Sequence, residues 1–295
     1  MSNKFVVNFT PTGMIPKKSD NPFVPVTSDE IIQDIQAAWE SGITMVHLHV
    51  RDEITEQPCY KKESYAKVIK GIREFAPELV ICVSTSGRNF SDFGKRAEVL
   101  QLEGDLKPDM ASLTLSSLNF NKQASINEPS MILDLAREMQ NKGIKPELEV
   151  FDAGMINYAK YLINKNLLTA PFCFSLILGN IACAQADLLH IGLMIRDLPE
   201  QSTFSLGGVG NSQLPVNSLA ISMGYGVRTG LEDNLWYDPS RSRLASNIEL
   251  LQRIKKLGRA NEKEIMTPSE LRFLLGLKKG CGEYGINEVL ASRGS

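Results

Sequence analysis

The chain has 295 residues, of which 43% are hydrophobic and 22% are charged, and its formal net charge at pH 7 is −2. Such a length suits one large domain or two small ones. The charge is nearly balanced and no run of Lys or Arg is longer than a pair, so we expect neither nucleic acid nor an anionic membrane surface as a partner.

The five cysteines, at positions 59, 82, 173, 183 and 281, are scattered and odd in number, and none has Cys-x-x-Cys spacing. This pattern favours reduced thiols in a cytoplasm over a disulfide framework or a zinc ribbon. No segment has 18 uninterrupted apolar residues, and the first residues lead directly into a predicted strand rather than a signal peptide. We therefore expect a cytoplasmic protein.

Apolar runs typical of strands alternate with stretches of helical periodicity along the whole chain. The predicted strands are 5–10, 44–50, 79–85, 110–115, 147–151, 172–178, 203–207 and 226–230. The predicted helices are 31–40, 64–75, 129–141, 154–166, 186–195, 215–223 and 243–257. Thr27 supplies a capping signal before the first helix, and Gly143 supplies a stop signal after the third.

This alternation predicts an α/β fold, and we favour a parallel, eight-stranded (β/α)8 TIM barrel over a doubly wound open sheet with the same local pattern. No low-complexity linker divides the chain, so we expect one domain over residues 1–295 with a short C-terminal extension from about 259 to 295. Within it, Thr267 begins a short closing helix, 271–277. The Gly-rich residues 280–295 are expected to be mobile or to pack on a neighbouring subunit.

Two of the three histidines, His47 and His49, lie on the second predicted strand. Residues i and i+2 of a strand share a face, so both imidazoles can be presented to one divalent metal ion, although they can also be satisfied polar groups at a barrel rim. Glu232, just after the eighth strand, would complete a two-His, one-carboxylate site. This ligand set suits catalytic Zn²⁺, and Fe²⁺, Mn²⁺ or Co²⁺ stay open by ligand type alone.

Other polar residues also gather where strands end, and the active site of a parallel barrel lies at that rim. They include Ser84, Ser112, Thr114, Glu147, Glu149, Asp152 and Arg228. The turn that contains Gly208, Gly210 and Asn211 can bind phosphate through backbone N–H groups or be a turn without a ligand. His190 is expected on a helix, exposed or at the edge of the core. Amidohydrolases, which draw histidines from strands five and six, are therefore disfavoured.

Several ordered motifs cover nearly the whole chain: HLHVRD at 47–52, VSTSGR at 83–88, PDMASL at 108–113, KPELEVFD at 145–152 and VRTGLEDN at 227–234. Together they resemble the β-keto acid cleavage enzymes, whose founding activity is 3-keto-5-aminohexanoate cleavage. The resemblance implies a TIM barrel, usually in a homotetramer, with a divalent metal ion that is typically Zn²⁺. It also implies a reaction in which a β-keto acid and acetyl-CoA give acetoacetate and a new acyl-CoA.

Carried onto this sequence, the resemblance makes His47, His49 and Glu232 the metal ligands. The catalytic polar set would be Ser84, Arg228 and Asp233, with Asp233 paired to Arg228 and acting as the base. Ser112 and Thr114 would line the substrate pocket, and we assign Glu149 to it as well. The glycine-rich turn at Gly208, Gly210 and Asn211 would serve the CoA side.

Three positions depart from the family pattern. Ile15 stands where members acting on amino-bearing substrates carry a Glu, so a buried ammonium would have no partner, and we predict a substrate without a distal positive charge, with an apolar end as one option. Asn211 replaces an Arg, and Ala182 stands in a turn that contains glycine in relatives. These two changes leave CoA use open.

Three functional hypotheses follow from these observations. The leading one is a metal-dependent β-keto acid cleavage enzyme that uses acetyl-CoA. The second is a metal-dependent aldolase or lyase that needs no CoA. The third is a catalytically silent barrel that binds a metal or metabolite, which is disfavoured because an inert barrel does not need the charged trio of Arg228, Glu232 and Asp233 at a strand end.

Overall fold

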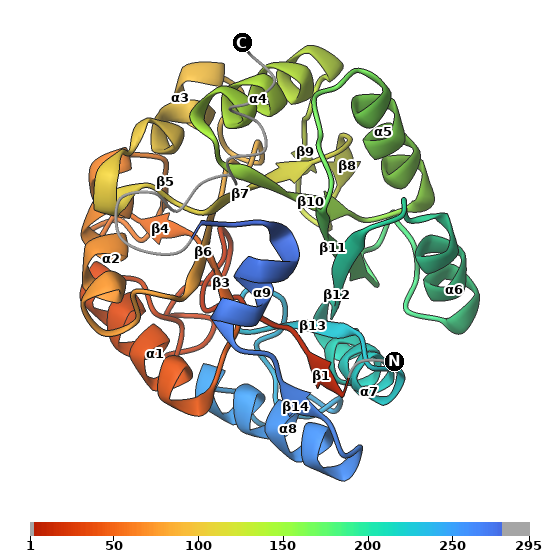
Figure 1. Ribbon diagram of the computed structural model, residues 1–295. Helices are drawn as coiled ribbons and strands as arrows, with labels where there is room; N and C mark the ends of the chain where they lie inside the picture. The colour runs from red at the N-terminus through yellow and green to blue at the C-terminus, as the bar shows by residue number, and fades with distance from the viewer. Residues whose placement is uncertain (1–2, 279–295) are drawn as a thin grey trace.

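The computed structural model describes residues 3–278, and its centre is a closed barrel of eight parallel strands (Figure 1). The barrel strands are β2 (Val7–Phe9), β3 (Met45–Leu48), β6 (Val80–Val83), β7 (Met110–Thr114), β10 (Lys145–Val150), β11 (Phe172–Leu178), β12 (Ser202–Gly208) and β13 (Gly226–Thr229). Each pairs with its neighbours in chain order, and β13 pairs with β2 to close the sheet. The predicted (β/α)8 barrel is confirmed, and the open sheet is excluded.

Helices cover the outside of the barrel (Figure 1). They are α1 (Ser28–Ser41), α2 (Lys62–Phe75), α3 (Phe93–Ala97), α4 (Pro129–Lys142), α5 (Ala153–Asn164), α6 (Leu188–Asp197), α7 (Gln213–Met223) and α8 (Asn247–Ala260), with 3-10 turns η1 (Glu98–Gln101), η2 (Gly104–Leu106) and η3 (Gly210–Ser212). The last helix, α9 (Pro268–Leu275), lies across one end of the barrel (Figure 1). Every predicted helix is found with its boundaries shifted by a few residues. The short α3, η1 and η2, between the third and fourth barrel strands, were not predicted.

Three small two-stranded sheets lie outside the barrel. They are β1 (Lys4–Phe5) with β14 (Glu264–Ile265), β4 (Val50–Arg51) with β5 (Pro58–Cys59), and β8 (Leu118–Asn119) with β9 (Ala124–Ser125). The predicted strand 5–10 is therefore divided, since Phe5 pairs with β14 rather than with the barrel. Helix α8 begins at Asn247 instead of 243 because Ser246 and Glu249 form a capping box at that point.

The barrel interior is apolar at one end and polar at the other. Near the starts of their strands, Met45, Met110 and Cys173 belong to one buried cluster with Leu271 and Leu275 of α9. Helix α9 therefore closes this end of the barrel, as predicted for the short helix in the C-terminal extension (Figure 1). Towards the carboxyl ends of the strands the inward side chains become polar.

Other expectations concern single residues and segments. Among residues 3–278, no helix combines the length and apolar character needed to cross a bilayer. The four cysteines in that range are free thiols, as predicted, while Cys281 and the Gly-rich segment 280–295 lie outside the described residues. His190 is half-exposed on α6, with Nδ1 2.7 Å from Asp187 Oδ2, so it is a surface histidine as expected.

Candidate active site

The predicted metal ligands come together at the polar end of the barrel. His47 lies on β3 and His49 follows its last residue, and their Nε2 atoms are 3.3 Å apart. Glu232, in the loop after β13, places Oε1 3.4 Å from His49 Nε2. One ligand atom from each of the three residues lies within 4.8 Å of the others, and the imidazoles are buried. The sequence period of two on a strand is what gives the histidines their common direction.

The donor set fits a divalent cation. Glu232 Oε2 is buried and has no hydrogen-bond partner among the described residues, and an acceptor in that state is costly unless a cation or donor satisfies it. Two imidazoles and one carboxylate are also the ligands that catalytic zinc sites commonly use. The geometry and the orphaned oxygen therefore favour a metal ion between His47, His49 and Glu232.

A second carboxylate, Glu147 on β10, fixes the orientation of His47. Its Oε2 lies 2.6 Å from His47 Nδ1, while its Oε1 accepts from Asn8 Nδ2 at 2.6 Å and from Ser175 Oγ at 2.7 Å. A carboxylate bound to Nδ1 keeps the proton there and turns Nε2 toward a metal. Burial by itself lowers the pKa of His47, but the Glu147 and Glu232 charges outweigh it and raise that pKa to about 9. A metal ion must therefore displace a proton to bind.

Arg228 organises the acidic groups around this site. The guanidinium is fully buried on β13 and reaches Asp233 Oδ2 with Nε at 3.0 Å, Glu232 Oε1 with Nη2 at 2.8 Å and Glu149 Oε1 with Nη1 at 3.4 Å. The expected pairing of Arg228 with Asp233 is thus present. Burial, together with repulsion from Glu232, raises the pKa of Asp233, although Arg228 partly offsets the effect. A carboxylate with a raised pKa is a stronger base.

These side chains open into a cavity of about 340 Å³. Its walls include the predicted site residues Ile15, His49, Ser84, Thr114, Glu149, Arg228, Glu232 and Asp233. Its lining also includes the apolar side chains of Leu118, Phe120, Phe151 and Ile177. The cavity therefore combines a charged inner end with an apolar lining, as small-molecule sites usually do.

The sequence profile of the beta-keto acid cleavage enzymes matches residues 4–277. A 3-keto-5-aminohexanoate cleavage enzyme of Fusobacterium nucleatum is 36% identical over 95% of this chain and 100% of its own length. A 3-oxoadipate:acetyl-CoA acetyltransferase of Cupriavidus necator is 34% identical over 94% of this chain and 96% of its own.

The chain belongs to the β-keto acid cleavage enzyme family. Its reaction class is therefore the cleavage of a β-keto acid, and the silent barrel is not supported.

Solved structures agree with the fold. The ternary complex of ObcA with a C4-CoA adduct and oxalate has a TM-score of 0.76 at 21% identity, and the match covers 87% of this chain and 68% of that one. At such low identity the likeness concerns the barrel alone, and this chain spans about two thirds of the length of ObcA.

Not every residue carried over from the family pattern faces the cavity. Ser112 is buried on β7, and its Oγ accepts from the backbone N–H of Thr85 at 3.2 Å rather than lining the pocket. Asn211 is exposed and its amide donates to the carbonyl of Pro239, and neither Gly208 nor Gly210 lines the cavity. Gly210 N–H instead donates to the carbonyl of Asp233 at 2.8 Å, so the turn supports the base from outside.

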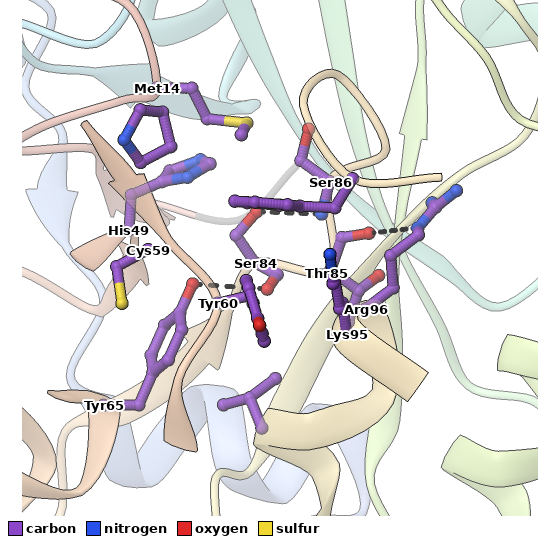
Figure 2. Close-up of a pocket in the computed structure, with 13 residues that line it drawn as sticks. Met14, His49, Cys59, Tyr60, Tyr65, Ser84, Thr85, Ser86, Lys95 and Arg96 are labelled. Carbon is purple, nitrogen blue, oxygen red and sulfur yellow. Dashed lines mark hydrogen bonds between the residues drawn. The ribbon is translucent and has the colours of Figure 1, made fainter. Parts of the chain in front are cut away.

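Ser84 lies at the edge of a second, smaller hollow of about 20 Å³ beside His49 (Figure 2). Tyr65 Oη donates to the carbonyl of Ser84 at 3.3 Å, and Arg96 Nε donates to the carbonyl of Thr85 at 2.8 Å. Figure 2 shows both contacts on the loop that follows β6. This loop is therefore tied down on two sides, which holds the Ser84 side chain at the rim.

The loop that carries Glu232 is held by two residues that the sequence did not single out. A Cβ atom at Gly13 would lie 2.5 Å from Glu232 Cγ, so only glycine leaves room for the carboxylate here. Asn247, the first residue of α8, accepts from the backbone N–H of Leu231 and donates to the carbonyl of Pro11, both at 2.8 Å. Glu147 was noted as a polar strand residue, but its role at His47 was also missed.

The amide of Asn247 also donates to Asp34 of α1 at 2.5 Å, and this contact leads to a pH prediction. Burial raises the pKa of Asp34 to about 6, so its charged form is disfavoured in the folded protein. The penalty is absent below the pKa of the unfolded chain, about 3.9, and complete above pH 6. Titration of Asp34 should therefore lower the free energy of unfolding of the wild-type protein as the pH rises from about 4 to about 6.

We expect Asp34→Asn, which keeps an acceptor for Asn247, to be more stable than wild type by about 1–3 kcal/mol near pH 7. The gain should disappear near pH 3, below the pKa of the unfolded chain, where Asp34 is protonated in both states. Urea unfolding at the two pH values measures this difference. An equal gap at both values would show that titration of Asp34 is not its source.

Proposed function

We propose that the protein is a divalent-metal-dependent enzyme that converts a β-keto acid and acetyl-CoA into acetoacetate and a new acyl-CoA, with a substrate that lacks a distal positive charge. The observation that carries the proposal is the joint placement of His47, His49 and Glu232 beside the Arg228–Asp233 pair, at a cavity that all of them except His47 line. The names of the relatives support the use of acetyl-CoA.

His47, His49 and Glu232 would hold the metal ion, which we propose to be Zn²⁺. When bound, the ion would supply a Lewis acid that orients the carboxylate and keto oxygens of the substrate and polarises the keto group. Glu147 would keep His47 in the tautomer that leaves Nε2 available. The buried Arg228 would hold Asp233 in place beside the substrate.

Asp233 would accept a proton from the carbon between the keto and carboxylate groups. The resulting carbanion attacks the acetyl thioester, which forms a carbon–carbon bond and releases the CoA thiolate. The thiolate then attacks the original keto carbon, the older carbon–carbon bond breaks, and the proton returns to the carbon from which it came. The products are acetoacetate and an acyl-CoA made from the rest of the substrate, so all atoms are conserved.

The lining of the cavity at Ile15 supports the proposal that the substrate lacks a distal positive charge. Ile15 lines the cavity and offers no negative charge to an ammonium group. The two other departures bear less on CoA use than the sequence implied, because Asn211 and Ala182 are exposed and neither lines the cavity. This placement favours acetyl-CoA use over the lyase that needs no CoA.

The remaining proposals rest on composition and resemblance. We infer one domain over the whole chain, a homotetramer and a cytoplasmic location, the last because the cysteines are scattered and unpaired. Light scattering of the purified protein tests the tetramer.

The test of function is a panel of β-keto acids given to the Zn²⁺-loaded protein with and without acetyl-CoA, with acetoacetate and acyl-CoA followed by mass spectrometry. We expect both products only when acetyl-CoA is present, and loss of both after the metal is stripped with a chelator. Cleavage without CoA would establish the lyase instead, and full activity of the stripped protein would overturn the metal requirement.

A further inference from the structure

Arg88 is a second arginine in the cavity, and its guanidinium forms no direct ion pair within the described residues. It lies in the loop after β6 and lines the same cavity as His49 and Glu232. Within residues 3–278, no carboxylate lies at ion-pair distance from its guanidinium, which also makes no hydrogen bond there. Arg228, by contrast, is surrounded by three acidic partners.

The side chain of Arg88 is nevertheless held in place. Its Cζ lies 3.4 Å from the centroid of the Phe120 ring, and Phe120 in turn packs edge-on against Phe151 with centroids 5.8 Å apart. The same loop is joined to the segment after β8 by Gln123 Nε2, which donates to Asn89 Oδ1 at 3.0 Å. Stacking on an aromatic face leaves the edge of a guanidinium, with its N–H groups, free for a planar anion.

A partly buried arginine with unused donors carries a desolvation cost that a bound anion would offset. The inner acids Glu149, Glu232 and Asp233 attract Arg88 only from beyond ion-pair distance, and their direct partner is Arg228, so they do not supply that anion. The cavity is lined by a further cation, Lys122, which is exposed and also forms no ion pair within the described range. The segment around Arg88 therefore attracts negative charge into the cavity.

Resting on the proposed function, we propose that Arg88 recognises a second carboxylate at the distal end of the substrate, so that the preferred substrate is a dicarboxylic β-keto acid. Arg88 then determines specificity, and its planar fork would bind the distal carboxylate in a bidentate way. The apolar side chains that line the same cavity, Phe120, Phe151 and Ile177, would contact the aliphatic middle of the substrate. The absence of an acid at Ile15 agrees with this charge preference.

Three six-carbon substrates of matched length test the proposal: 3-oxoadipate with a distal carboxylate, 3-oxohexanoate with a methyl end, and 3-keto-5-aminohexanoate with an ammonium. We expect the highest kcat/KM for 3-oxoadipate. Arg88→Met should lower that value about 100-fold and leave 3-oxohexanoate within a few fold of wild type, because only the first substrate loses charged hydrogen bonds. The kcat/KM of Arg88→Lys for 3-oxoadipate should lie between those of wild type and Arg88→Met, since lysine keeps the positive charge but cannot form a bidentate pair.

Other results would overturn the assignment in distinct ways. An equal loss on 3-oxoadipate and 3-oxohexanoate would show that Arg88 binds the carboxylate that all β-keto acids share. A raised KM for acetyl-CoA with both substrates would assign Arg88 to a CoA phosphate. Retained turnover of 3-oxohexanoate shows that Arg88→Met is folded, and Arg137→Met, which removes an exposed ion pair on α4, is the control for a lost surface charge.

A binding measurement separates this proposal from the proposed function. Calorimetric titration of 3-oxoadipate without acetyl-CoA reports recognition even when no product can form. Binding by wild type that weakens about 100-fold in Arg88→Met supports the proposal even if the reaction proves to be different. Turnover of 3-oxohexanoate with no preference for 3-oxoadipate would support the proposed function but contradict the proposed role of Arg88 in binding a distal carboxylate.

Discussion

Glu232→Ala is expected to lose both the metal ion and turnover, whereas Asp233→Asn is expected to keep the metal ion and lose only turnover. The two acids are adjacent in sequence, but their surroundings differ. Glu232 lies 3.4 Å from His49 and has a buried oxygen with no hydrogen-bond partner among the described residues, which a bound cation would satisfy. Asp233 instead takes Arg228 Nε at 3.0 Å and has a pKa raised mainly by burial, as suits a base.

Metal content per chain, measured by mass spectrometry after dialysis, should fall to trace levels in Glu232→Ala and stay near wild type in Asp233→Asn. Turnover should fall at least about 100-fold in both, which is the lower end of what a positioned acid or base contributes. Asp134→Asn, an exposed acid on α4, is the matched control and should change neither. Loss of metal from Asp233→Asn would show that the adjacent acids share one role.

The parts of the site that sequence could predict are those that depend on local period and on barrel topology. His47 and His49 share a face because a strand repeats every two residues, and Glu232 follows the eighth strand, so all three must meet at the same rim. Topology alone therefore brings together residues that are almost two hundred positions apart.

What sequence did not predict depends on contacts between side chains from different strands and loops. Glu147 faces His47 across the barrel interior, and no spacing in the chain says that these two residues meet. Ser112 has the right position on its strand, but its hydroxyl is occupied by the neighbouring backbone of Thr85. Arg88 stands out because it lines the cavity without an ion-pair partner among residues 3–278, which becomes visible only when the loops have been placed.

Arg228→Met is expected to destabilise the metal-free protein by about 3–5 kcal/mol, because it leaves buried acids without their counter-charge. Glu149, Glu232 and Asp233 all lie within 3.4 Å of its nitrogens, and all three line the cavity beside it. Methionine fills much of the same space, so most of the loss should come from charge rather than from a void. Urea unfolding in the presence of a chelator measures the difference.

Arg243→Met is the matched control, since Arg243 pairs with Glu249 at the surface and such pairs contribute at most about 1 kcal/mol. Added Zn²⁺ should recover part of the loss in Arg228→Met, because a cation bound at Glu232 stabilises the folded state by mass action and replaces some of the missing positive charge. If Arg228→Met proved no less stable than Arg243→Met, the acids would have to be neutral or solvated in the folded protein. Asp233 would then lack the fixed, charged state on which its role as a base depends.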